Sequence, residues 1–253
     1  MSTWVFLRGL AREARHWGDF PATFQAEITD ANIIAPDLPG NGQLNQLKSP
    51  LSVREMVDGY REELKRRGIS PPCHLLGLSL GAMVAVDWAT AYPREILPIV
   101  LINTSLRPIS PFYQRLRPHN YRSLLVMATL RGDGEETERA ILHMTSTRRD
   151  PQSDVINAWV SYRTQNPVTR VNALRQLIAA ARYHAPKLKP DVPLLVLAAA
   201  KDRLVNPQCS QQLANRWHAA LAMHPEAGHD LPLDDGAWVA RRVREWMVAR
   251  TVA

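Results

Sequence analysis

The sequence alternates short apolar runs with longer stretches of helical periodicity, and this alternation limits its fold more than any other feature. The apolar runs are largely uninterrupted, as expected for strands of a parallel sheet that is covered on both faces. The predicted strands are Thr3–Leu7, Asn32–Asp37, Cys73–Leu78, Ile99–Asn103, Leu194–Ala200 and Ala220–His224. The predicted helices are Trp17–Thr29, Val53–Arg67, Leu80–Ala91, Gln208–Trp217 and Asp235–Thr251. This pattern predicts a doubly wound α/β fold with about six, mostly parallel strands.

One segment interrupts the alternation. Between the fourth and fifth predicted strands lie roughly 90 residues with several helical patterns but no convincing strand, and a structureless loop of that length is rare inside a domain. We therefore predict a helical cap over residues 107–190, inserted into a core domain formed by residues 1–106 and 191–253. The cap segment holds 14 Lys and Arg against 6 Asp and Glu, in a chain of net charge +7. The basic excess therefore lies in the predicted cap.

Composition excludes several classes of protein. The chain is 45% hydrophobic and 22% charged, which is typical of a globular domain. No apolar run reaches the roughly 18 residues of a membrane span. The positive charge comes without a nucleic-acid-binding motif or a basic patch interleaved with aromatic residues, so no nucleic-acid partner is expected.

The sequence carries no motif for a metal ion, a nucleotide or a signal peptide. Cys73 and Cys209 form no CxxC pair, no cluster of His, Cys and carboxylates has metal-ligand spacing, and no glycine-rich nucleotide-binding loop occurs. The first residues lack the basic, apolar and small-residue succession of a signal peptide. We expect a cytoplasmic protein without a metal or another cofactor.

The sharpest local signal is Gly77-Leu78-Ser79-Leu80-Gly81, which fits the pattern G-x-S-x-G between a predicted strand and a predicted helix. A serine hydroxyl is a weak nucleophile and must be presented to a base. A sharp strand-to-helix turn does so and directs the helix N-terminus at a developing oxyanion. Ser79 is therefore the candidate nucleophile.

A nucleophilic serine needs a histidine base and a carboxylate that orients the histidine. His229 follows the last predicted strand, and Asp202 follows the fifth. Because active sites of open α/β sheets gather at the carboxyl ends of the strands, Ser79, Asp202 and His229 can converge there.

In that order along the chain, these residues and the G-x-S-x-G turn resemble the α/β-hydrolase superfamily. The segment Asp37-Leu38-Pro39-Gly40-Asn41-Gly42 also resembles the D-x-P-G-x-G turn of that family. The resemblance implies an oxyanion hole formed by the backbone N–H groups of Leu10 and Leu80. It also implies that the first strand of this chain corresponds to the third strand of many relatives, so that the first two are absent. Many relatives carry histidine where this chain has Arg8.

The resemblance is to small capped carboxylesterases, including the pimeloyl-carrier-protein methyl ester esterases. It implies hydrolysis of a carboxylic ester through an acyl-enzyme on Ser79, with His229 as base and Asp202 as the orienting acid. The arginine-rich cap would suit an acidic carrier protein, a carrier-linked ester or a substrate carboxylate. The main alternative is C–C cleavage or elimination on an anionic substrate by the same triad, as in the menaquinone-pathway synthase. A non-catalytic ligand-binding protein on this fold is a further alternative.

Five apolar side chains are candidates for lining an acyl pocket, although each would be equally at home in a hydrophobic core. They are Trp17, Leu106, Met127, Trp159 and Leu204.

Overall fold

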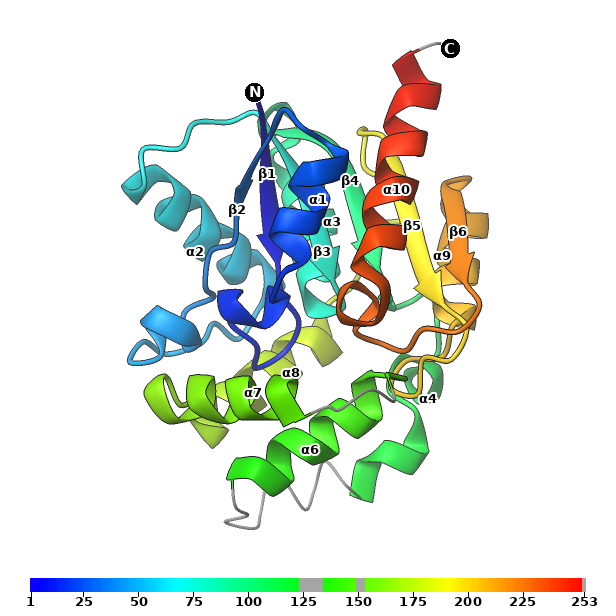
Figure 1. The fold of residues 1–253 in the computed structure, drawn as a ribbon. Coiled ribbons are helices and arrows are strands. Elements are labelled where there is room, and N and C mark those ends of the chain that lie inside the picture. The colour runs from blue at the N-terminus through cyan, green and yellow to red at the C-terminus, as the bar shows by residue number, and fades with distance from the viewer. Residues whose placement is uncertain (123–133, 149–152, 252–253) are drawn as a thin grey trace.

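The computed structural model describes residues 1–122, 134–148 and 153–251. These residues form a six-stranded sheet in the order β2-β1-β3-β4-β5-β6, and each pair of neighbouring strands is parallel. The strands are β1 (Ser2–Leu7), β2 (Ala31–Ile34), β3 (Cys73–Leu78), β4 (Ile96–Ile102), β5 (Leu194–Ala199) and β6 (Ala220–His224). The predicted doubly wound, parallel α/β fold is confirmed (Figure 1).

Helices cover both faces of this sheet (Figure 1). On one face pack α1 (Phe20–Glu27) and α10 (Leu231–Thr251), and on the other pack α2 (Val53–Arg66), α3 (Leu80–Ala91) and α9 (Gln208–Trp217). Short 3-10 turns are η1 (Ala14–Trp17), η2 (Gly42–Leu44), η3 (Pro93–Glu95) and η4 (Pro118–Asn120).

Strand β1 shows why the predicted strands are continuous apolar runs. Val5 and Leu7 point into the core cluster beneath α2 and α3, whereas Trp4 and Phe6 point into the cluster beneath α1 and α10. All four side chains are buried. Successive side chains of a strand point to opposite faces, so a strand that is covered on both faces has no polar positions.

The chain between β4 and β5 crosses the carboxyl ends of the strands, where α4 (Phe112–Arg115), α6 (Gly134–Thr145), α7 (Ser153–Gln165) and α8 (Arg170–Arg182) lie (Figure 1). Leu142, Ile156 and Trp159 form a small apolar cluster of their own between α6 and α7, whereas Ala179 of α8 belongs to the main core. Residues 123–133 and 149–152 of this segment lie outside the described residues. The division into a core and a cap with limits at 107 and 190 stays a prediction.

Local sequence signals place the ends of α2 as expected. Ser52 Oγ accepts a hydrogen bond from Glu55 N at 3.2 Å, and the Glu55 carboxylate accepts one from Ser52 N. This is a capping box. At the other end, Gly68 has a φ of +71° and closes the helix through a hydrogen bond to the Lys65 carbonyl.

The sequence-based prediction is wrong at one helix start. No single helix runs from Trp17 to Thr29, because Gly18 with a φ of +53° separates η1 from α1. The helix predicted from Asp235 is present, but a short helical turn from Leu231 precedes it within α10, and non-helical backbone at Asp235 separates the two parts. The Asp235 side chain accepts a hydrogen bond from Trp238 N at 2.9 Å, so it caps the longer second part.

Two strand boundaries also differ from their predictions by three residues. Strand β2 ends at Ile34 and not at Asp37, because this edge strand pairs only with β1, from Ala31 to Ile34. Strand β4 begins at Ile96, three residues before the predicted start at Ile99. Its extra residues reach across to β3, where Ile96 lies opposite Cys73.

None of the helices that the structure describes has the length and apolar character needed to cross a lipid bilayer.

Aromatic packing beneath α1 gives a prediction about stability. The ring of Phe24 is fully buried against Trp4, Phe6 and Phe20, with ring centroids 4.9–5.7 Å apart. We expect Phe24→Ala to lower the free energy of unfolding by about 3–5 kcal/mol, because it leaves a cavity in the core. Phe112→Ala is the control, since 73% of the Phe112 side chain is exposed and its loss should change stability by less than about 0.5 kcal/mol. Equal effects of both substitutions in urea titrations would contradict this packing.

Candidate active site

Ser79 is the single residue between β3 and α3, and its backbone is strained. Its φ of +57° and ψ of −111° lie outside the regions that non-glycine residues favour. The two glycines of the motif make this turn possible. A Cβ on Gly77 would lie 2.5 Å from the Gly81 carbonyl oxygen, and a Cβ on Gly81 would overlap the Leu7 carbonyl. The motif therefore forms the sharp turn that the sequence predicts.

The end of β4 holds this turn in place. Ser79 N donates to the Ile102 carbonyl at 2.9 Å, and the Thr104 hydroxyl donates to the Ser79 carbonyl at 3.0 Å. Strain of this kind persists only where the surroundings over-determine the backbone, and these two hydrogen bonds do so here.

Asp202 and His229 form a buried pair. His229 Nδ1 lies 2.7 Å from Asp202 Oδ2, and both side chains are almost fully buried. The other carboxylate oxygen of Asp202 accepts hydrogen bonds from Leu204 N at 2.8 Å and Val205 N at 2.9 Å. These backbone donors fix the orientation of the carboxylate, and the carboxylate in turn orients the imidazole.

Charges around His229 set its pKa. Burial by itself lowers that pKa, but the charge of Asp202, its hydrogen bond and the charge of Asp230 outweigh the burial. Arg8 acts in the opposite direction. The net result is a pKa above the ordinary 6.5, as expected for an imidazole paired with a buried carboxylate.

Asn103, which sequence analysis did not single out, links the loops that carry these groups. Its side-chain amide donates to the carbonyls of Gly228 at 3.1 Å and His229 at 2.8 Å, and its side-chain oxygen accepts from Ala199 N at 2.8 Å. Asn103 directly follows Ile102 and has a φ of +46°. Because the adjacent residues 102 and 104 hold Ser79, the serine turn and the histidine loop meet at one short segment.

The loop after β1 lies against the serine turn. A Cβ on Gly9 would lie 3.5 Å from Ser79 Cβ, in ordinary contact. Leu10, the predicted oxyanion donor, follows Gly9. Leu80, the second predicted donor, is the first residue of α3, and the first N–H groups of a helix have no acceptor within it.

Polar side chains from distant segments fasten this loop. Ala11 N donates to Gln176 Oε1 at 2.8 Å, and Gln176 is a fully buried residue of α8. The Arg12 carbonyl accepts from Asn41 Nδ2 at 2.9 Å, and Asn41 in turn accepts from Gln176 at 2.7 Å. These bonds give Asn41 a structural role in holding the loop.

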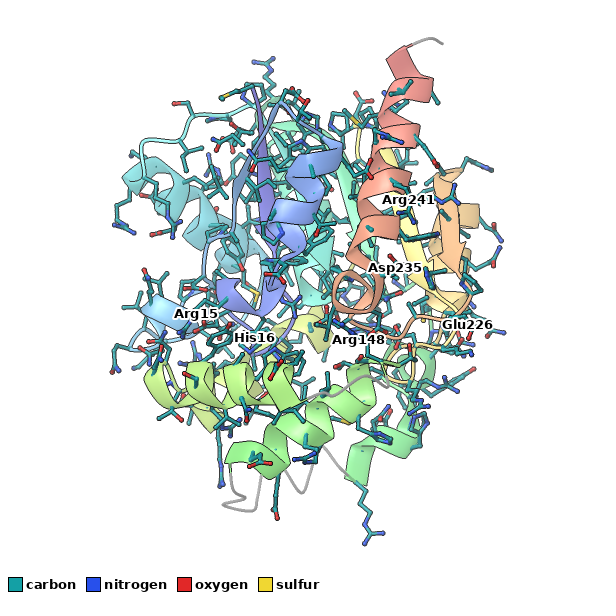
Figure 2. The ribbon with its side chains drawn as sticks, viewed as in Figure 1. Arg15, His16, Arg148, Glu226, Asp235 and Arg241 are labelled. Atoms are coloured by element: carbon teal, nitrogen blue, oxygen red, sulfur yellow. The ribbon has the colours of Figure 1, made fainter. Side chains whose placement is uncertain are left out.

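Arginines of the same segment join it to α6 and α7. Each lies over an aromatic ring: Arg8 over Trp17 at 4.7 Å, Arg12 over Trp159 at 4.2 Å and Arg15 over Tyr162 at 4.4 Å. Arg12 also pairs with the buried Glu138 of α6 at 2.7 Å. Figure 2 shows Arg15 and His16 at this junction, above the helices that cross the strand ends.

His16 belongs to the same junction. Its Nδ1 accepts from Glu13 N at 3.2 Å, and its Nε2 lies 2.9 Å from Arg12 Nη1. Burial and the charges of Arg12 and Arg8 hold the pKa of His16 well below its usual range, so the buried imidazole stays neutral.

The predicted pocket-lining residues are placed differently from one another. Trp17 and Leu106 are buried in the two main core clusters, and Trp159 is buried in the small cluster under Arg12. Leu204 is partly exposed, and its N–H donates to Asp202. Met127 lies outside the described residues.

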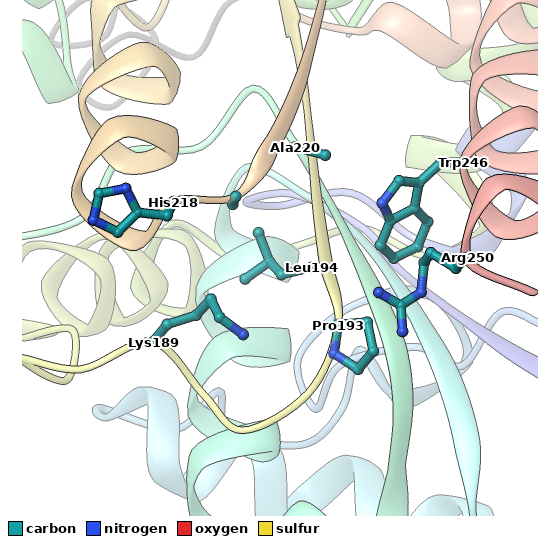
Figure 3. Close-up of a pocket in the computed structure, with 8 residues that line it drawn as sticks. Lys189, Pro193, Leu194, His218, Ala220, Trp246 and Arg250 are labelled. Atoms are coloured by element: carbon teal, nitrogen blue, oxygen red, sulfur yellow. The ribbon is translucent and has the colours of Figure 1, made fainter. Parts of the chain in front are cut away.

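Metal-binding clusters and pockets elsewhere in the fold are the other possible kinds of site. Within the described ranges, no group of three or more His, Cys, Asp or Glu side chains is arranged to hold a metal ion. A pocket lined by Lys189, Leu194, His218, Ala220, Trp246 and Arg250 lies at the amino ends of β5 and β6 (Figure 3). It is therefore at the opposite end of the sheet from Ser79.

The sequence matches a model described as the alpha/beta hydrolase family over residues 4–242, and the chain therefore belongs to this family. It is 27% identical over 216 residues to "Biotin biosynthesis bifunctional protein BioHC" of Cellvibrio japonicus, which covers 78% of this chain but only 39% of that protein. It is 25% identical over 247 residues to "Putative carbamate hydrolase RutD" of Escherichia coli, which covers 91% of this chain and 85% of that protein. The second of these names is that of a hydrolase.

Solved structures share the fold. An esterase from Thermogutta terrifontis superposes with a TM-score of 0.76 at 20% identity, covering 98% of this chain and 90% of that chain. An enol-lactonase from Burkholderia xenovorans superposes with a TM-score of 0.79 at 17% identity, covering 98% and 91%.

The close contact between α3 and β1 gives a test of the turn. Gly81→Ala places a methyl group on the Leu7 carbonyl, so we expect it to lower the free energy of unfolding by about 3 kcal/mol. Gly59→Ala is the matched control, because a Cβ there would meet Pro39 no closer than 3.4 Å within α2, where alanine is the better helix former. Chemical denaturation of both variants compares them. A Gly81→Ala protein as stable as Gly59→Ala would be incompatible with this contact.

The pair of Asp202 and His229 can be tested by titration. Because the charge and hydrogen bond of Asp202 raise the pKa of His229 against its burial, we expect Asp202→Asn to lower that pKa. NMR titration of the imidazole carbons measures it, with the His229 signal assigned by its loss in His229→Gln. Asp191→Asn, at an exposed site before β5, should leave the titration unchanged. An unchanged or raised pKa in Asp202→Asn would refute the pairing.

Proposed function

We propose that this protein hydrolyses carboxylic esters through an acyl-enzyme on Ser79. The observation that carries the proposal is a serine on a strained strand-to-helix turn, at the same end of the sheet as a buried pair of Asp202 and His229, in which the carboxylate raises the pKa of the imidazole. A turn of this kind presents a nucleophile, and an imidazole that is oriented by a buried carboxylate is suited to general base catalysis.

In the first half-reaction, Ser79 Oγ attacks the ester carbonyl carbon and transfers its proton to His229 Nε2. The Asp202 carboxylate stabilises the imidazolium through Nδ1. Negative charge develops on the carbonyl oxygen, and the backbone N–H groups of Leu10 and Leu80 are the proposed donors to it. His229 then gives its proton to the leaving alkoxide, which departs as the alcohol.

In the second half-reaction, His229 takes a proton from water, and the hydroxide attacks the acyl carbon. The tetrahedral intermediate collapses, the proton returns to Ser79 Oγ, and the carboxylic acid leaves. Every proton moves between the substrate, Ser79, His229 and water, so the proposed cycle needs no cofactor.

The relatives support ester-type hydrolysis at the level of their names. One is a biotin biosynthesis protein and another carries the name of a carbamate hydrolase, and an esterase shares the fold. Which ester this chain takes follows from none of them. Attraction of an acidic or carrier-linked substrate by the basic segment between β4 and β5 stays a prediction, as does a cytoplasmic location.

The proposal is tested with p-nitrophenyl esters from acetate to decanoate. We expect turnover that falls by about a thousandfold or more in Ser79→Ala, because the nucleophile is lost. Ser70→Ala, at an exposed serine before β3, should keep full activity. The chain length that is cleaved fastest would measure the depth of the acyl site.

Ester turnover that survives in Ser79→Ala would contradict the proposal. So would a folded protein that cleaves none of the esters. In that case, C–C cleavage or elimination by the same residues becomes the better explanation, and it predicts that no acyl-Ser79 species can be trapped for mass spectrometry.

A further inference from the structure

Two loops carry groups that the proposed mechanism brings to the reacting carbonyl. The loop after β1 carries Leu10, and the loop after β6 carries His229. In the sheet, β1 and β6 are separated by β3, β4 and β5. A direct side-chain contact nevertheless joins the two loops: Arg8 Nη1 donates to Asp230 Oδ1 at 3.2 Å, and Arg8 Nη2 donates to Asp230 Oδ2 at 2.7 Å.

Both partners of this contact are buried and held in place. Each side chain is only 5% exposed. The Arg8 guanidinium lies over the Trp17 ring, and Asp230 N donates to the Thr145 carbonyl at 2.7 Å, at the end of α6. A two-point pairing of guanidinium and carboxylate fixes both distance and orientation, whereas a single contact leaves rotation free.

We propose that Arg8 and Asp230 are positioning residues. They hold the loop after β1, which carries Leu10, in a fixed position relative to the loop after β6, which carries His229, and their opposite charges balance each other beside His229. Neither touches the reacting atoms. This inference rests on the proposed function, because it assigns Leu10 and His229 the roles given there.

The charges that face His229 come from three loops. Asp202 follows β5, Asp230 is the next residue in its own loop, and Arg8 follows β1. Asp230 raises the pKa of His229 and Arg8 lowers it, so the two charges of the buried pair oppose each other. Loss of one partner should therefore shift the pKa of His229 in a direction that depends on which charge is removed.

The first test uses the acid limb of the pH profile of kcat/KM for a p-nitrophenyl ester, because His229 must be neutral to act as base. Arg8→Gln removes a cation and leaves the Asp230 anion unpaired, so the limb should move to higher pH. Asp230→Asn removes the anion, so the limb should move to lower pH. In the double variant the two shifts should largely cancel.

Arg8→Lys separates geometry from charge. It keeps the cation but cannot make the two-point contact, so the acid limb should stay in place. The plateau kcat should still fall by roughly tenfold to a hundredfold with little change in KM, since small misplacements of reacting groups cost that much. Arg8→Lys and Asp230→Asn also carry the test if Arg8→Gln folds poorly.

A matched control lies elsewhere in the fold. Arg61 contacts Glu95 at two points, 2.9 and 2.7 Å, and lies 3.6 Å over the Tyr92 ring, so it repeats the chemistry of Arg8 away from both loops. Arg61→Gln should leave the acid limb and kcat unchanged. Thermal unfolding of each variant shows that all are folded at the assay temperature.

The positioning role is overturned if the two single variants shift the limb in the same direction or not at all, or if Arg8→Lys keeps full kcat. Failure of the proposed function would look different. If the folded protein cleaves no ester, NMR titration of His229 still reports the two opposite shifts, so the charge coupling can be judged without turnover. Opposite shifts there would support the coupling even with the esterase proposal refuted, and their absence would overturn it.

Discussion

The first turn of α3 passes so close to β1 that the Leu7 carbonyl leaves no room for a side chain at position 81. This contact fixes the helix over the centre of the sheet, and Ser79 absorbs the resulting turn with a positive φ. Glycines on both sides avoid the steric conflict, while one hydrogen bond to the Ile102 carbonyl and one from the Thr104 hydroxyl maintain the strained residue. The position of the candidate nucleophile therefore follows from backbone packing that the core itself enforces.

The parallel strands bring Asp202 and His229 to the same end of the sheet as Ser79, but they do not orient these side chains. Orientation comes from buried polar contacts between loops. Asn103 ties the histidine loop to the end of β5, Gln176 of α8 holds the loop after β1, and Arg8 joins that loop to Asp230. An unpaired polar group is costly when it is buried. The loops therefore favour the arrangement in which these contacts form.

The helices between β4 and β5 take part in the same network. Arg12 reaches Glu138 of α6 and lies over Trp159 of α7, and Asp234 of the last helix accepts hydrogen bonds from Thr147 N and Gly228 N. These helices therefore contact both the proposed oxyanion loop and the histidine loop. The segment that would shape a substrate pocket also stabilises the loops beneath it.

The sequence alone determined the parallel α/β fold, because buried strands and capped helices leave periodic apolar patterns, and it predicted Ser79, Asp202 and His229 as candidate catalytic residues by motif and by position after strands. It could not reveal Asn103, the Arg8–Asp230 pair or the junction around Arg12 and His16. Those residues have ordinary neighbours in the chain, and their partners are as many as 222 positions away. Local propensity is encoded in adjacent residues, whereas charge pairing across loops exists only once the sheet has brought the strand ends together.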